Sequence, residues 1–285
     1  MGFISARAIV ADISPREHLA RSVAHMTMLM LVVQSVAPLL GNMVMAAGGW
    51  QAIQFFGAAL ATGLLAGVAR TQPETLPASH RAAHGSAIKD FLRPTFSVLA
   101  TPGVPRLLLQ VGLLYSAYPA FLSIAPHLMV EAFRRPPTEF AYYFVLLPLG
   151  YFAGNAFVLK AGSSFGTHRM VFAGSLFALC SCLIGIVLIA MGTRHPLALF
   201  IPAGLMLNFG LGLALPTVSA RAVTQSSPHI GSGWGLVGCA QQVMAALAVQ
   251  VLGLFSADSP YPVLMTCLVA MMLVLVFERS RRSAS

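Results

Sequence analysis

Long apolar runs separated by short polar segments dominate the pattern of this chain. Each run has about 20 residues, which at about 1.5 Å per residue in a helix is enough to cross the roughly 30 Å hydrocarbon layer of a membrane. Shorter apolar stretches would be expected for the helices of a soluble core. The pattern therefore predicts eight membrane-spanning helices, at residues 23–46, 50–69, 106–130, 140–159, 170–192, 196–217, 232–255 and 261–277.

A shorter apolar piece at residues 1–11 precedes these runs. It is too short to cross a membrane alone, so we expect it to be part of a further helix. Residues 70–105 form the one long polar interruption, and 91–100 within it have the pattern of an amphipathic helix at the membrane surface. We therefore predict an N-terminal bundle remnant at 1–69, a linker at 70–105, a six-helix bundle at 106–278 and a tail at 279–285.

Composition excludes a water-soluble protein and changes how the net charge is interpreted. Of the 285 residues, 57% are hydrophobic and 9% are charged, whereas soluble domains have about 25% charged residues. The net charge of +9 lies in single residues between apolar runs and not in a basic patch, which argues against a nucleic-acid partner. On one side of the predicted spans only Arg134, Arg135 and Arg194 are basic, so the opposite side, with the linker and the C-terminus, is expected to be cytoplasmic.

Patterns typical of enzymes, metal sites and cofactor sites are not found. The chain has no Gly-x-Ser-x-Gly, no phosphate-binding glycine loop and no His or Cys spacing for a metal, so we expect no catalysis, no cofactor and no metal. Its eight acidic residues lie in predicted loops or within about a turn of a predicted span end, a pattern that places no carboxylate in the middle of the membrane.

Several residue types within the spans have both a structural and a functional interpretation. The pairs Gly63 with Gly67 and Gly150 with Gly154 allow close helix packing, or helices that rock against each other. His127 is either an interfacial residue or a titratable group facing the outer side. Polar and aromatic residues could form hydrogen bonds between helices or line a substrate pathway: Gln34, Tyr115, Tyr118, Phe121, Asn155, Asn208, Gln241 and Gln242.

Four local motifs are distinctive: the segment from Arg7 to Asp12, the segment from Pro38 to Gly41, Gly49 with Trp50, and Pro216 with its preceding glycines. Together they resemble the Bcr/CflA group of drug/proton antiporters in the major facilitator superfamily. In that order, they are similar to the end of helix 4, the proline-glycine antiporter motif of helix 5, the entry to helix 6, and helix 10.

This resemblance implies the superfamily's all-α fold of two six-helix halves, with this chain covering helices 4 to 12 of twelve and beginning within helix 4. It also implies a multi-pass protein of the bacterial inner membrane, surrounded by lipid, that exports small amphipathic molecules by alternating access in exchange for protons. Two alternatives remain: a truncated fragment that does not transport, and a membrane scaffold subunit.

Overall fold

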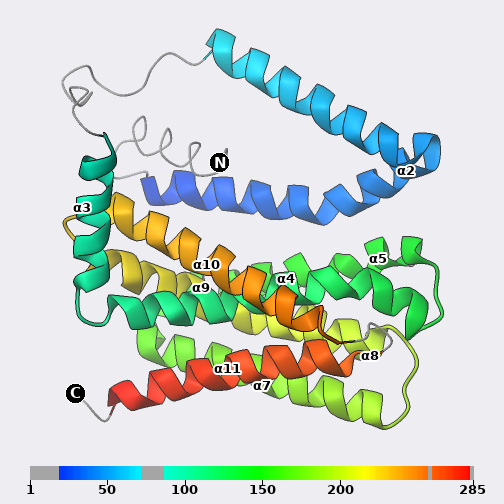
Figure 1. The fold of residues 1–285 in the computed structure, drawn as a ribbon. Helices are drawn as coiled ribbons and strands as arrows, with labels where there is room; N and C mark the ends of the chain where they lie inside the picture. Colours follow the sequence, from blue (N-terminus) through cyan, green and yellow to red (C-terminus); the bar gives the residue numbers. More distant parts are fainter. Residues whose placement is uncertain (1–18, 72–86, 256–258, 283–285) are drawn as a thin grey trace. The chain divides into compact units, whose positions relative to one another are not determined.

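The structure is a computed structural model that describes residues 19–71, 87–255 and 259–282. Within these ranges the regular elements are all helical (Figure 1). Seven of the helices are long and apolar enough to cross a membrane, in the part of the chain that is described. This confirms the predicted all-α transmembrane fold.

The first two predicted spans form one element, α2 (Leu19–Thr71), which contains a sharp break. Gly48 and Gly49 leave the helical conformation there, and Gly49 has a φ of 69°, a left-handed value that favours glycine. The break falls between the predicted spans 23–46 and 50–69. The eight predicted spans therefore correspond to seven long helices because the first two are joined.

A short helix and a long helix follow the undescribed part of the linker. Helix α3 (Ala87–Ala100) contains the predicted surface helix, and α4 (Val104–Glu131) begins after a turn whose last residue, Gly103, has a φ of 88°. The left-handed Gly103 lets the chain turn sharply within a few residues. Backbone hydrogen bonds from Thr101 to Val98 and from Val104 to Thr101 hold this turn.

The remaining elements form spans that alternate in direction along the bundle. They are η2 (Pro137–Glu139), α5 (Phe140–Phe144), α6 (Leu146–Phe165), α7 (Thr167–Ala190), α8 (Leu197–Leu199), the π-helix η3 (Phe200–Met206), α9 (Leu207–Gln225), α10 (Ile230–Leu252) and α11 (Tyr261–Arg282). The predicted span 140–159 is divided between α5 and α6, and 196–217 between α8, η3 and α9.

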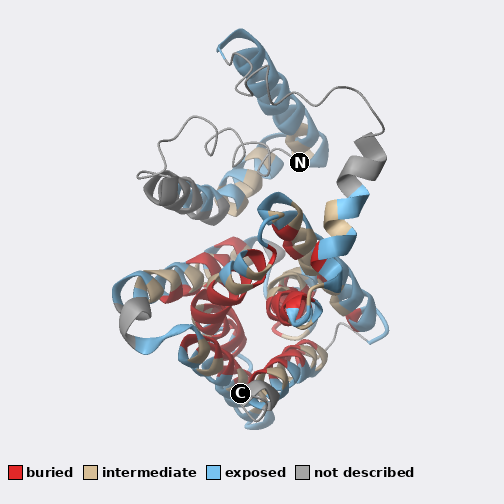
Figure 2. Ribbon diagram, turned by 90° about the vertical axis from the view of Figure 1, so that its left-hand side faces the viewer, coloured by how far each residue is buried: buried red, intermediate tan, exposed pale blue. Residues whose placement is uncertain are grey.

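The chain separates into two compact units, Met1–Ala87 and Ile88–Ser285. The described buried hydrophobic side chains lie in the second unit, mostly on α4, α7, α9 and α11. In Figure 2 the buried segments, in red, lie on the inner sides of this bundle. In the first unit, the described side chains of α2 are mostly exposed. Among the described residues, the second unit therefore has the core that can position a site.

Glycine contacts hold α9 tightly between α6 and α7. A Cβ at Gly154 would lie 2.9 Å from the Cα of Gly212, and a Cβ at Gly174 would lie 2.6 Å from the carbonyl oxygen of Gly210. Distances this short leave no room for a side chain, so the backbones touch directly, as in other membrane helix pairs with small residues. The predicted packing role of Gly150 and Gly154 is confirmed, whereas no atom of the described structure lies within 4 Å of a Cβ placed at Gly63 or Gly67.

Candidate functional site

Glu278 is the one charged residue that is buried among the residues described by the structure. It lies in the last turns of α11, and only 1% of its surface is exposed. A carboxylate removed from water is costly unless charged and hydrogen-bonding partners surround it. The partners of Glu278 therefore define the most unusual polar site in the second unit.

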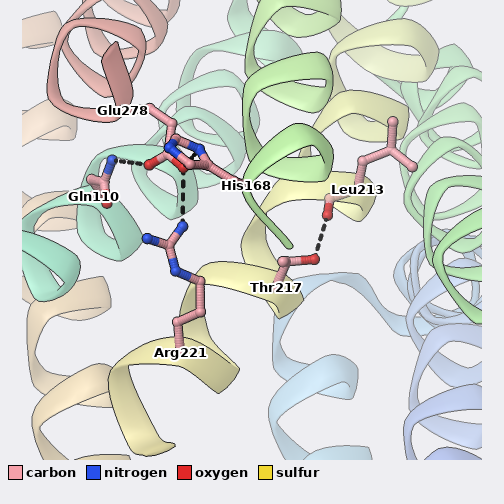
Figure 3. A network of polar contacts seen from close by, with 6 residues as sticks. All are labelled: Gln110, His168, Leu213, Thr217, Arg221 and Glu278. Carbon is pink, nitrogen blue, oxygen red and sulfur yellow. Dashed lines mark hydrogen bonds and ion pairs between the residues drawn. The ribbon is translucent and has the colours of Figure 1, made fainter. Parts of the chain in front are cut away.

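Three helices supply these partners (Figure 3). The Nε2 of Gln110 donates a hydrogen bond of 3.0 Å to Oε2 of Glu278, and a guanidinium nitrogen of Arg221 lies 3.0 Å from Oε1. His168 approaches the same Oε1 with its Nδ1, as an ion pair when the imidazole is protonated. We call these four residues the Glu278 network.

The network forms at one end of the bundle because its helices alternate in direction. Gln110 and His168 lie near the beginnings of α4 and α7, whereas Arg221 and Glu278 lie near the ends of α9 and α11. In an antiparallel arrangement these beginnings and ends are neighbours.

Two pockets border the network. One, of about 540 Å³, lies between α6, α7 and α9 and is lined mainly by apolar groups, with Arg221 and Gln225 in its wall. The other, of about 120 Å³, is lined by residues 102–110 and again by Gln225. The side-chain oxygen Oε1 of Gln225 is buried without a hydrogen-bond partner in the described structure. Arg221 thus belongs both to the network and to the wall of the apolar pocket.

The network can bind helices together, but its composition does not suggest catalysis. Its one carboxylate accepts hydrogen bonds from a guanidinium and an amide and lies against the imidazole of His168, so stabilising contacts surround it. Within the described residues, no group of three or more His, Cys, Asp and Glu residues could hold a metal ion. The Glu278 network is therefore a polar contact that joins four helices by hydrogen bonds and ion pairs.

Comparison with protein-family models shows which family of proteins contains this chain. The model of the Major Facilitator Superfamily matches residues 1–249, which is most of the chain. The chain belongs to the Major Facilitator Superfamily. As a member of this superfamily with seven long apolar helices, it is a multi-pass membrane transporter. A comparison with curated proteins gives no significant match.

Some of the predicted pathway residues lie in the core of the second unit, and others are more exposed. Phe121 is fully buried against Phe200, with their ring centroids 5.4 Å apart, and Asn208 is buried with its Nδ2 donating to the carbonyl of Gly204. Asn155 is half-buried and donates to the carbonyl of Tyr151 in its own helix. These three side chains are occupied by contacts within the bundle.

The other predicted pathway residues are more accessible. Tyr115 and Tyr118 on α4 and Gln241 on α10 are half-buried, and Gln242 is exposed. Helices α4 and α10 lie side by side, because a Cβ at Gly112 of α4 would be only 2.8 Å from the carbonyl oxygen of Ala240. The tyrosines and glutamines therefore lie on two neighbouring helices. The side chain of Gln34 lies outside the described residues.

The motif residues occupy different environments. Arg7 and Asp12 lie outside the described residues. Pro38 and Gly41 are half-buried within α2, Gly49 forms its break, and Trp50 is exposed directly after it. Pro216 lies inside α9 and lines the larger pocket, and His127 is exposed on α4.

Sequence reasoning missed the Glu278 network because it placed the helix ends too early. The predicted spans end at residues 217 and 277, whereas α9 continues to Gln225 and α11 to Arg282, which places Arg221 and Glu278 inside helices. One signal was present: an acid and a base follow two apolar spans on the same predicted side of the membrane. Their opposite charges at similar depth could have suggested a pair.

Proposed function

We propose that this transporter is of the multidrug efflux type and exports small amphipathic molecules by alternating access in exchange for protons. We place it in the bacterial inner membrane with its C-terminus in the cytoplasm. The basic side chains near the linker and the C-terminus support this orientation, because positively charged segments favour the cytoplasmic side. The motif at Pro38 and Gly41 supports the antiporter assignment by resemblance.

The observation that carries the proposal is the pairing of α4 with α10. Gly112 lies against Ala240, which brings Gln241 to the depth of Gly112 and within about one turn of Tyr115. Incompletely buried aromatic rings and amides on adjacent helices combine apolar contact with hydrogen bonding. Such a surface suits amphipathic molecules of varied shape better than a single charged substrate.

The Glu278 network has a mechanical role in this proposal. By joining α4, α7, α9 and α11 at one end, it holds the second unit as one body while the transporter changes its access. Alternating access by largely rigid bundles requires that each bundle keeps its internal contacts. The network therefore supports transport without touching the substrate.

Efflux of a fluorescent cationic drug from cells that express this chain tests the proposal. We expect energy-dependent efflux that falls when a protonophore collapses the proton gradient, and that falls severalfold in a Gln241→Leu variant present at equal amounts in the membrane. The Tyr142→Phe variant is a matched control, since Tyr142 is exposed on α5 and belongs to no proposed pathway. Absence of efflux, with verified membrane insertion, would favour the alternatives of a non-transporting fragment or a scaffold subunit.

A further inference from the structure

The larger pocket, between α6, α7 and α9, has no part in the proposed efflux pathway. Its volume of about 540 Å³ lies within the range of about 300–1,000 Å³ that is usual for small-molecule sites. None of the described pathway residues lines it: Val158 contributes from α6, Thr167 and Met170 from α7, and residues between 216 and 225 from α9. The pocket is therefore separate from the polar and aromatic surface on α4 and α10.

Most of the wall suits the apolar part of a ligand. Met170 has an apolar side chain, and the threonines of α9 use their hydroxyl protons within the helix. The hydroxyl of Thr217 donates to the carbonyl oxygen of Leu213 at 2.9 Å, as Figure 3 shows, and that of Thr224 donates to the carbonyl oxygen of Ala220 at 2.8 Å. The wall therefore offers mainly methyl and methylene groups to an occupant.

Arg221 gives this apolar pocket a positively charged group. Its guanidinium has five N–H donors, and the contact with Glu278 uses the nitrogen Nη1. The side chain is only 14% exposed and forms part of the pocket wall. A guanidinium in this position can bind a second anion from the pocket while it keeps its contact with Glu278.

Gln225 supplies a second polar group in the same wall. It follows Arg221 by four residues on α9, so the two side chains share one face of the helix. The Oε1 of Gln225 is buried without a hydrogen-bond partner in the described structure, so turning the amide over breaks no hydrogen bond of that oxygen. The turned amide presents its NH₂ group, which donates to an anion.

The charges around the pocket favour anions over cations. Lys160 near the end of α6, Arg169 at the beginning of α7 and Arg279 near the end of α11 are exposed at the same end of the bundle. Glu278 is the one acid among the described side chains there, and it is already paired with Arg221. A potential of one sign attracts an anionic ligand and repels a cationic one.

We propose that this pocket binds an amphipathic monocarboxylate, with the carboxylate at Arg221 and Gln225 and the apolar body between α6, α7 and α9. At roughly 30 Å³ for each water-sized group, the volume admits about 18 non-hydrogen atoms, which is too few for a phospholipid with two acyl chains. This inference goes beyond the proposed efflux function, because binding requires the fold of the second unit and not transport. Since Arg221 belongs to the Glu278 network, an occupied pocket acts on the contact that joins the four helices.

Photolabelling with octanoate that carries a diazirine near its methyl end tests the site. The full chain is reconstituted in phosphatidylcholine nanodiscs, and mass spectrometry locates the labelled residues. We expect labelling at Val158, Met170 and residues 216–225, and displacement by octanoate at concentrations about tenfold lower than by octylammonium, which has the same chain length and the opposite charge. Labelling spread evenly over the exposed faces of all the helices, or equal displacement by the two compounds, would overturn the proposal.

Two variants separate the shape of the pocket from its charge. Ala220→Leu fills the pocket and leaves Arg221 in place, so labelling should fall about tenfold; Ala153→Leu, at an exposed position of α6 outside the pocket, should label like the parent. The double variant Arg221→Gln with Glu278→Gln removes the guanidinium without leaving an unpaired buried acid. It should lower labelling about tenfold or more, because charge-assisted hydrogen bonds are lost. Labelling at the parent level in Ala220→Leu or in the double variant would refute the assigned site.

A lipid headgroup has similar anionic chemistry, and the composition of the nanodisc distinguishes the two sources. Labelling should stay within about twofold when phosphatidylglycerol replaces part of the phosphatidylcholine, because a two-chain lipid does not fit the pocket. Loss of labelling in these nanodiscs would assign the pocket to anionic lipid and overturn a soluble carboxylate. The assay requires no transport, so specific labelling of a chain that shows no efflux would refute the efflux function and support this site.

Discussion

Replacing Glu278 with Gln should strongly destabilise the second unit, although the two side chains have nearly the same shape. The Glu278→Gln variant leaves the guanidinium of Arg221 without its counter-charge in a site where Arg221 is only 14% exposed. Two unit charges about 4 Å apart attract each other by about 4 kcal/mol at an effective dielectric constant of about 20. Losing one partner of a buried pair typically costs about 3–5 kcal/mol, because the remaining charge stays buried.

We expect a cost of about 3 kcal/mol, at the low end because Arg221 keeps some contact with water. For a domain of about 200 residues, 1 kcal/mol lowers the melting temperature by about 2–4 °C, so the variant should melt about 6–12 °C below the parent. Thermal unfolding of the purified chain in detergent, followed by tryptophan fluorescence, measures this difference.

Two further variants make the argument refutable. The pair Arg135–Glu139 is exposed, with 4.0 Å between its charged atoms, so Glu139→Gln should lower the melting temperature by no more than about 2 °C. The double variant Arg221→Gln with Glu278→Gln should be more stable than Glu278→Gln alone, because no unpaired charge remains. The Glu278 network does not stabilise the bundle if Glu278→Gln melts within about 1 °C of the parent. The same conclusion follows if the double variant lowers the melting temperature by the sum of the two single-variant decreases.

Three other results are expected. Gly154→Leu should cost at least about 1–3 kcal/mol and disrupt the packing of α6 on α9, while Gly238→Leu, with nothing within 4 Å of its Cβ, should fold normally; size-exclusion profiles distinguish them. Phe200→Ala should lower the free energy of unfolding by about 3–5 kcal/mol, since the ring is fully buried among other aromatic rings, and chemical denaturation measures this. Gln242→Leu should reduce drug efflux at constant membrane level, and unchanged efflux would remove Gln242 from the pathway.

The helices could be predicted from the sequence because each depends on its own run of residues. Hydrophobic length alone identified the long helices from α4 to α11, and the boundary predicted between spans 23–46 and 50–69 coincides with the break in α2. The helical conformation of residues 91–100 was equally predictable, since an amphipathic pattern needs no partner helix to be recognised. Features that depend only on neighbouring residues in the sequence can be predicted without knowing the fold.

The contacts between helices could not be predicted in the same way. Helix ends were placed where hydropathy falls, but a helix continues past that point when a partner satisfies its polar side chain. Glu278 follows its apolar run by a single residue, so hydropathy assigned it to the membrane surface. Its burial depends on Gln110, His168 and Arg221, which are far away in the sequence, and no pattern within α11 contains that information.

The same reasoning explains why the predicted pathway residues separate into two groups. Phe121 and Tyr118 are three residues apart on α4 and have similar character, yet Phe121 is fully buried against Phe200 and Tyr118 is only partly buried. The difference comes from the helix that each side chain faces, since η3 covers one part of α4 and the neighbouring part is less completely covered. In a chain that is apolar on all sides, the rotation of each helix decides which polar or aromatic groups can meet a substrate, and only tertiary contacts fix that rotation.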